Sequence, residues 1–300
     1  MNSLPLWQLK KQMCDVGGRI WQRGYCAGNE GNHSVRLGDG RILCTPTGVS
    51  KGFLSPEDIC VVDMEGKQIE PNPSGRTRTS EILVHLAVYK QRPDVQALIH
   101  SHPPHATAFA IANVPIPEGI HPEAEVFLGR VPIARYATPS TQELPDSITP
   151  LIKPETNSII MSNHGTISFS NKDIIDAYYL LEILDAYCRV LLLASQLGRV
   201  NVLKTDQVAD LLAIKQKFGL TDERIACAAD GCVGLDNEPF LASVDVRPAS
   251  ATCACNGADV ASVQRHSEPT DPAGTDDVTY EALVQAITDQ IMGEESRDGG

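Results

Sequence analysis

Three segments of the chain have the apolar periodicity of an α-helix. Residues 4–24 alternate polar and apolar positions in the manner of an amphipathic helix. Residues 79–91 repeat apolar positions at helical spacing, and Thr79 or Ser80 can supply the N-cap. Residues 173–197 are apolar on most sides, which predicts a long buried helix that also packs against another subunit.

Short apolar runs between these helices predict β-strands. RILCTP and DICVVDMEG flank a turn-rich loop, and VQALIHSH, residues 95–102, is a third run. SIIMSNHGTISF, residues 158–169, contains two runs around a polar break. This alternation of helix and strand predicts an α/β body with a central sheet covered by helices.

The charge of the chain changes sharply along its length. The formal net charge is −13, yet residues 1–205 carry 20 acidic and 19 basic side chains, whereas residues 206–300 carry 18 and 6. We therefore expect a compact domain over residues 1–220 and an acidic flexible linker over residues 221–275. Neither part has a basic patch, which argues against a nucleic-acid partner.

A helical pattern returns near the C-terminus, in VTYEALVQAITDQIM, residues 278–292. Its apolar side chains fall on one face, and Asp276 or Asp277 can cap it. We expect residues 276–300 to form a short amphipathic helix at the end of a mostly disordered tail. This helix either folds back on the body or acts as a docking peptide that inserts into a groove of a partner.

The cysteines and the apolar runs indicate a protein of the cytoplasm. No stretch approaches the roughly 18 to 20 unbroken apolar residues of a membrane span, and the first thirty residues lack a signal-peptide core. The nine cysteines are an odd number in scattered contexts, which is typical of reduced thiols. Cys227, Cys232, Cys253 and Cys255 could form a second cluster, although their spacing matches no common zinc motif.

Three histidines are candidate metal ligands. If residues 95–102 form a strand, His100 and His102 point to the same face, which suits a Zn²⁺ ion with an open position for substrate. His164 precedes Gly165 at a junction between two strand-like runs, where ligands from separate strands can converge. The alternatives are a surface pair for the first two and an ordinary turn histidine for the third.

Three loops have the composition of an anion site. Each combines small residues, hydroxyls and free backbone N–H groups, which can hold a phosphate without much positive charge. Ordinary turns and a helix cap would use the same residue types. The candidates are Gly31 and Asn32, Thr47 and Gly48, and Thr79 and Ser80.

Taken together, the motifs GNHSVR, TPTG, TSE, HSHPPH, YATPST and NHGTIS resemble the class II aldolase/adducin family, and within it the L-fuculose-phosphate aldolase branch. The resemblance runs from about residue 6 to residue 220. It implies a three-layer α/β/α fold with a central mixed sheet. It also implies a homotetramer with active sites at the subunit interfaces.

The resemblance also implies roles for individual residues. It assigns zinc to His100, His102 and His164, and it assigns the catalytic carboxylate to Glu81. It assigns the substrate phosphate to the three loops, with Asn32, Thr47, Gly48, Thr79 and Ser80. The implied reaction is the reversible cleavage of a 6-deoxyhexulose 1-phosphate, L-fuculose or L-rhamnulose 1-phosphate, to dihydroxyacetone phosphate and lactaldehyde. Glu81 can also be interpreted as a first-turn glutamate favoured by the helix dipole.

The chain departs from the aldolase branch at two tyrosines. Pro122 stands where the branch has a tyrosine thought to protonate the leaving aldehyde, and Phe218 replaces a C-terminal tyrosine. His121, Glu123 and Glu125 are the nearest substitutes, although HPEAE could equally be a solvated turn. His105 and Arg36 are weaker candidates, His105 as support for the metal site and Arg36 as a structural residue.

Other functions remain open on the same residues. A pentulose 5-phosphate 4-epimerase or a methylthioribulose-phosphate dehydratase would use a similar triad, whereas adducin-like interaction modules have lost the metal ligands. The C-terminal helix resembles the encapsulation peptides that load enzymes into bacterial microcompartments. The hypothesis that follows is cargo bound to a microcompartment shell protein, which would confine the reactive lactaldehyde.

Overall fold

The computed structural model describes residues 4–228 and 237–243. Its centre is a seven-stranded sheet in the order β3-β2-β1-β4-β7-β6-β5. β5 and β6 are parallel, and all other neighbouring strands are antiparallel. The strands are β1 (Asn32–Arg36), β2 (Ile42–Cys44), β3 (Cys60–Val62), β4 (Ala97–Ser101), β5 (Ile133–Ala134), β6 (Ser158–Met161) and β7 (Gly165–Ser170).

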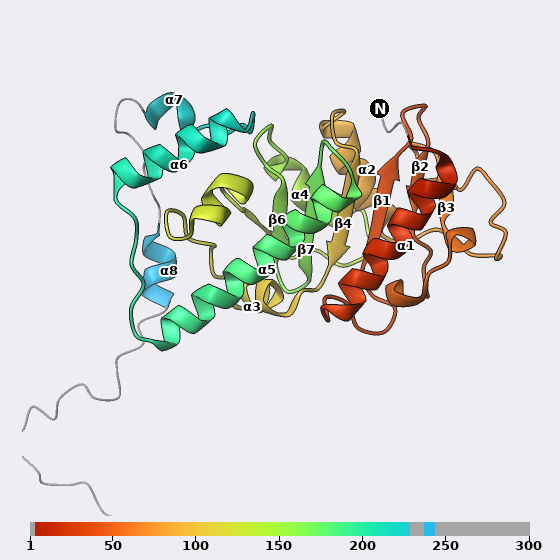
Figure 1. The fold of residues 1–300 in the computed structure, drawn as a ribbon. Coiled ribbons are helices and arrows are strands. Elements are labelled where there is room, and N and C mark those ends of the chain that lie inside the picture. Colours follow the sequence, from red (N-terminus) through yellow and green to blue (C-terminus); the bar gives the residue numbers. More distant parts are fainter. Residues whose placement is uncertain (1–3, 229–236, 244–300) are drawn as a thin grey trace, which may run out of the picture. The chain divides into compact units, whose positions relative to one another are not determined.

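Helices cover both faces of this sheet, which confirms the expected three-layer fold with a mixed sheet (Figure 1). The α-helices are α1 (Leu6–Gln22), α2 (Ile82–Gln91), α3 (Pro104–Ala112), α4 (Glu143–Ile148), α5 (Ile174–Gln196), α6 (Thr205–Lys217), α7 (Ile225–Ala228) and α8 (Glu238–Ser243). The short helical turns are η1 (Lys51–Phe53), η2 (Pro56–Asp58), η3 (Ala124–Leu128) and η4 (Thr149–Leu151). Within the described ranges, no helix has both the length and the apolar character that a membrane crossing requires.

The strands alternate between two apolar cores. In β4, Ala97 and Ile99 pack with α1 and α5, whereas Leu98 packs with α2 on the opposite face. Because successive side chains of a strand point to opposite faces, His100 lies on the same side as Leu98 and α2. The strand period therefore directs this histidine toward the start of α2.

Helix α2 begins three residues later than its sequence pattern suggests. Its N-cap position is Glu81, not Thr79 or Ser80. The preceding residues stay extended because they pair with the segment after β2: the Thr47 amide donates to the Thr77 carbonyl, and the Thr79 amide donates to the Thr45 carbonyl, both at 3.0 Å. This pairing leaves Glu81 at the junction of loop and helix.

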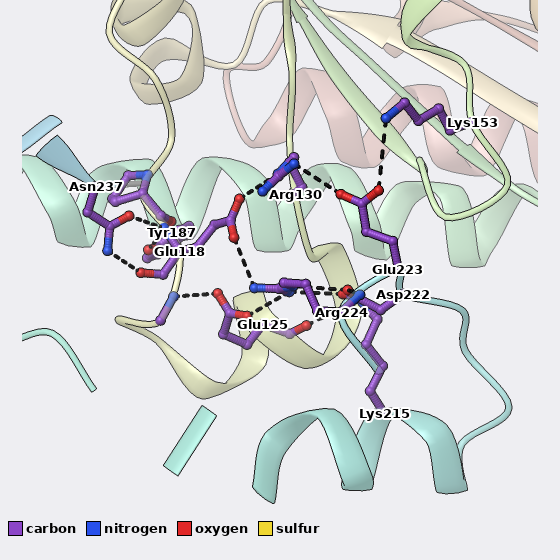
Figure 2. Close-up of polar contacts among 12 residues, drawn as sticks. Glu118, Glu125, Arg130, Lys153, Tyr187, Lys215, Asp222, Glu223, Arg224 and Asn237 are labelled. Carbon is purple, nitrogen blue, oxygen red and sulfur yellow. Dashed lines mark hydrogen bonds and ion pairs between the residues drawn. The ribbon is translucent and has the colours of Figure 1, made fainter. Parts of the chain in front are cut away.

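The packed body continues past Leu220, where the sequence predicted a linker to begin. Figure 2 shows a buried cluster of charges in which Arg224 contacts Glu118 at 3.0 Å and both Glu125 and Asp222 at 2.9 Å. Lys215 of α6 also reaches Asp222, at 2.9 Å. The acidic side chains of this region thus neutralise buried cations.

Residues 237–243 pack against the same part of the body. Asn237 accepts a hydrogen bond from the Glu118 amide at 2.7 Å and donates to its carbonyl at 2.6 Å (Figure 2). Phe240 is buried and stacks on Phe109 of α3, with ring centroids 6.2 Å apart. The predicted helix at 278–292 and the other residues of 244–300 lie outside the described residues.

Candidate metal centre and active site

The three predicted histidine ligands meet at one end of the central strands. His100 is in β4, His102 directly follows that strand, and His164 lies in the turn between β6 and β7. Antiparallel pairing of β4 with β7 sets Ser101 opposite Thr166, which brings the turn beside the two β4 histidines. The candidate ligand atoms of the three residues lie within 4.8 Å of one another. His100 is only 3% exposed, so the alternative of a surface histidine pair is wrong for it.

Hydrogen bonds orient two of the imidazoles for metal binding. Nδ1 of His100 donates to the Thr166 carbonyl at 2.9 Å, and Nδ1 of His102 donates to Glu30 Oε2 at 2.7 Å. With the proton on Nδ1, each Nε2 keeps a free lone pair, and the two Nε2 atoms are 3.2 Å apart. Two nitrogen ligands of a tetrahedral zinc ion are about 3.3 Å apart, given Zn–N bonds of about 2.0 Å. The residues fit a tetrahedral metal ion.

The surroundings of His100 and His164 favour their neutral imidazoles. Burial lowers the pKa of His100 well below its ordinary value, and the neighbouring His164 and His102 lower it further. Burial also lowers the pKa of His164. Because a metal binds the neutral imidazole, the cluster is ready to accept an ion at neutral pH.

Glu81 faces the same point as the three histidines. Its Oε2 is 3.3 Å from His100 Nε2, and its Oε1 is 3.5 Å from His164 Nε2. Asn32 Nδ2 donates to Oε2 at 2.9 Å. The carboxylate therefore lies beside the metal position without belonging to the histidine set, which suits a group that moves protons.

The structure brings the three candidate anion loops together. The pairing of residues 45–47 with 77–79 joins two of them, and the bond between Asn32 and Glu81 joins the third. Gly31 has φ +72°, and a Cβ there would lie 3.1 Å from the His100 carbonyl oxygen, so a larger residue does not fit. Gly48 also has a positive φ, of +70°.

The candidate phosphate ligands differ in how free their polar groups are. Thr79 is buried, and its hydroxyl accepts a hydrogen bond from the Glu81 amide at 3.3 Å. The Thr47 amide is already paired with Thr77. Ser80 is exposed, and its hydroxyl accepts a hydrogen bond from Ser140 at 3.1 Å. The side chains of Asn32 and Thr79 are thus engaged with Glu81, whereas Ser80 faces solvent.

Two site residues escaped the sequence analysis. Glu30, which holds His102, immediately precedes the predicted Gly31 and Asn32 loop. Lys51 is 2% exposed and donates to the carbonyls of Asn29 at 2.8 Å and Val49 at 2.6 Å, so it ties two of the loops together. Burial lowers the pKa of Lys51 to about 8. A buried lysine has little sequence signature, because only its neighbours distinguish it from a surface lysine.

The candidates for a second proton donor differ in their contacts and in their exposure to solvent. Glu125 is held in the buried charge cluster by Arg224 (Figure 2), so it has no free carboxylate to offer. His121 is partly exposed and lies 3.3 Å from Glu123. His105 bonds to Asp185 at 2.9 Å. Within the loop that carries Pro122, the Glu123 side chain is the more exposed of the two, at 62% against 36% for His121.

Arg36 has a structural role. Its guanidinium donates to the carbonyls of Tyr89 at 2.7 Å and Val95 at 2.9 Å. It thereby joins β1 to the end of α2, away from the histidines.

Comparison with known proteins identifies the family of this chain. Residues 11–192 match the family model described as the class II aldolase and adducin N-terminal domain. An L-fuculose phosphate aldolase of Methanocaldococcus jannaschii is 35% identical over 184 residues, which cover 61% of this chain and 96% of the relative. A 3-oxo-tetronate 4-phosphate decarboxylase of Haemophilus influenzae is 31% identical over 206 residues, covering 67% and 95%.

A solved structure extends the likeness to the fold. The solved structure of an L-fuculose 1-phosphate aldolase superimposes on this chain with a TM-score of 0.63 at 26% identity, and the match covers 71% of this chain and 97% of that chain. The chain belongs to the class II aldolase and adducin family.

Proposed function

We propose that this protein is a zinc-dependent aldolase that reversibly cleaves a 6-deoxyhexulose 1-phosphate, such as L-fuculose or L-rhamnulose 1-phosphate, to dihydroxyacetone phosphate and lactaldehyde. One observation carries the proposal: the Glu81 carboxylate lies 3.3 and 3.5 Å from the Nε2 atoms of His100 and His164. A group that can transfer protons thus lies beside the position that a metal ion would occupy. The intact ligands also argue against a purely adducin-like interaction module.

In this reaction the bond between C3 and C4 of the sugar breaks, and its electron pair stays on C3. The three histidines would hold a zinc ion, which would supply Lewis acidity for the negative charge left on this half of the sugar. Glu81 delivers a proton to C3 in cleavage and removes it in synthesis. His121 and Glu123 are our candidates for accepting the proton of the C4 hydroxyl, because both side chains reach solvent whereas Glu125 is already paired with Arg224.

We assign the phosphate group to the loops that carry Gly31, Thr47, Gly48 and Ser80, with Asn32 and Thr79 beside them. Lys51 supports this assignment because its buried ammonium ties the loops at Asn29 and Val49 and contributes positive charge there.

Metal content and turnover test the proposal together. His102→Ala should lose both zinc and activity, whereas Glu81→Gln should keep zinc and lose turnover by roughly 10² to 10⁴. Full activity of a metal-free preparation would overturn the aldolase mechanism. A panel of sugar phosphates, assayed by release of dihydroxyacetone phosphate, identifies the substrate and separates the aldolase from an epimerase or a dehydratase.

A decarboxylase acting on a phosphorylated 3-oxo acid is a second candidate. The Haemophilus influenzae decarboxylase is 31% identical over 67% of this chain. Carbon dioxide leaves without receiving a proton, so Glu81 alone could serve as the acid, and the replacement of the branch tyrosine by Pro122 would carry no penalty. Release of carbon dioxide from 3-oxo-tetronate 4-phosphate, with no aldehyde product from the sugar phosphates, would favour this function.

We further propose that the enzyme is a cytoplasmic homotetramer. Large apolar side chains remain exposed on α1, η1, α5 and the residue that follows α5, as expected of surfaces that pack against other subunits. They include Trp7, Trp21, Phe53, Leu193 and Leu197. Light scattering of the purified protein tests the oligomeric state.

The C-terminal residues 276–300 support a separate proposal from the sequence, docking to a microcompartment shell protein. Their deletion should leave activity and the tetramer intact and abolish co-purification with shell proteins. A deletion that changes the kinetics would assign this segment to the catalytic body instead.

A further inference from the structure

Two rows of polar side chains interlock between α2 and β1. The first row lies on one face of α2 at intervals of four residues and consists of the N-cap Glu81, His85 and Tyr89. The second row lies on one face of β1 at an interval of two residues and consists of Asn32 and Ser34. Four helical residues rise about 6 Å, and two strand residues rise about 6.6 Å. The nearly equal spacing lets each strand side chain enter the gap between two helix side chains.

The result is an unbroken chain of hydrogen bonds that ends on Glu81. Asn32 bonds to Glu81 at 2.9 Å and to His85 Nε2 at 2.5 Å. Ser34 bonds to His85 Nδ1 at 2.6 Å and to the Tyr89 hydroxyl at 2.8 Å. The four residues beyond Glu81 are all buried, with exposed fractions of 0 to 5%.

The chemistry of these groups gives the chain one direction. Because a carboxylate only accepts, Asn32 turns its Nδ2 to Glu81 and its Oδ1 to His85. His85 must then carry its proton on Nε2, so Ser34 donates to Nδ1 and Tyr89 donates to Ser34. Burial lowers the pKa of His85 to about 3 and raises that of Tyr89, so both stay neutral.

We propose that this chain, with His85 as its central positioning residue, fixes the direction in which the Glu81 carboxylate faces the metal position. The inference rests on the proposed function in that Glu81 is the proton-transfer group. Without the His85 N–H, the Asn32 amide can turn over and present its oxygen to the carboxylate, which repels Glu81 from its position. Asn32 is accordingly a positioning residue, since both ends of its side chain are in use.

Three substitutions test the role of His85 in the full-length zinc enzyme. His85→Phe should lower kcat roughly 10- to 100-fold, with unchanged KM and zinc content, as for other residues that orient a catalytic group. His85→Gln, whose amide can still donate to Asn32, should recover most of that loss. His33→Phe is the matched control, because His33 is equally buried and bonds to the Met13 carbonyl rather than toward Glu81.

Inhibition by inorganic phosphate separates positioning from phosphate binding. Asn32→Ala should reduce kcat as His85→Phe does and leave the inhibition constant for phosphate unchanged. A weaker inhibition constant in Asn32→Ala, together with an unaffected kcat in His85→Phe, would overturn the proposal and return Asn32 to the phosphate site. An equal loss of kcat in His33→Phe and His85→Phe would also overturn it.

A measurement that needs no turnover distinguishes this inference from the proposed function. The nitrogen chemical shifts of His85, recorded by NMR on the ¹⁵N-labelled protein, should report a neutral ring protonated at Nε2. If no substrate is cleaved but this tautomer is found, the aldolase proposal fails and the hydrogen-bond chain stands. A ring protonated at Nδ1, or a cationic ring, would refute the chain even in an active aldolase.

Discussion

Replacing Arg224 by methionine should destabilise the C-terminal part of the body. The Arg224 side chain is 7% exposed and lies 3.0 Å from Glu118 and 2.9 Å from both Glu125 and Asp222. Methionine preserves much of the apolar stem but removes every donor. The three buried carboxylates then lose a shared cation (Figure 2).

The remaining contacts determine the size of the effect. Glu118 still pairs with Arg130 at 2.7 Å, and Asp222 still pairs with Lys215 at 2.9 Å. Among the residues that the structure describes, only the Gly119 amide still donates to the Glu125 carboxylate, at 2.5 Å. Removing one partner of a buried pair costs about 3 to 5 kcal/mol, and the remaining partners put this case near 3 kcal/mol. For a domain of this size, that loss lowers the melting temperature by about 6 to 12 °C.

Thermal and urea unfolding, followed by circular dichroism, measure this loss. Arg130→Met is the matched control, because Arg130 contacts Glu118 and Glu223 with a side chain that is 51% exposed. Exposed pairs contribute about 0 to 1 kcal/mol, so the control should melt close to the native protein. Equal melting temperatures for Arg224→Met and Arg130→Met would refute the reasoning.

The pH dependence provides an independent check. Burial alone would raise the pKa of Asp222, but hydrogen bonds and charge from Arg224 and Lys215 outweigh it and hold the pKa below the ordinary 3.8. A carboxyl group with a depressed folded pKa stabilises the protein above its unfolded pKa and loses that contribution as the pH falls through the folded value. The difference between native and Arg224→Met protein should therefore be constant from about pH 5 to 8 and shrink below about pH 4.

Three further predictions concern the site. Gly165→Ala should weaken zinc binding, because the new Cβ would lie 2.5 Å from His102 Cδ2. Gly18→Ala is the control, since no atom lies within 4 Å of the Cβ position there. Equal zinc content of the two variants by mass spectrometry would contradict this prediction. Glu30→Gln should reduce zinc affinity about 10- to 100-fold, measured by competition with a chelator, because it weakens the hold on His102. Lys51→Met should raise KM for the phosphorylated substrate, because it removes the positive charge beside the phosphate loops. In the native enzyme, KM should rise as the pH increases through about 8, the pKa of Lys51. The variant should show no such rise in KM.

Local patterns in the sequence were sufficient for most of the elements and for the grouping of the candidate metal ligands. The two-residue period of residues 95–102 predicted that His100 and His102 lie on one face of a strand. The structure confirms this, because the ring nitrogens of both residues belong to one cluster at the end of β4. The polar break before Gly165 predicted His164 at a strand junction, and the turn between β6 and β7 confirms it. Such features depend on neighbours in sequence, so they are readable from the chain alone.

The N-cap of α2 shows where local patterns fail. Thr79 and Ser80 have the better capping side chains, yet the helix begins after Glu81 because residues 77–79 pair with 45–47. An extended segment thirty or more residues away competes with the local cap, and its hydrogen bonds decide where the helix begins.

Tertiary structure alone decided which polar groups became partners. Nothing near His85 in the sequence indicates that it bonds to Asn32 and Ser34, or that Glu30 holds His102. The same applies to Arg224, which lies in a stretch whose composition predicted a linker and yet pairs with Glu118 and Glu125 from more than ninety residues earlier. A polar side chain looks the same in sequence whether solvated or buried, and only the packing of distant elements creates the low-dielectric site that obliges it to find a partner.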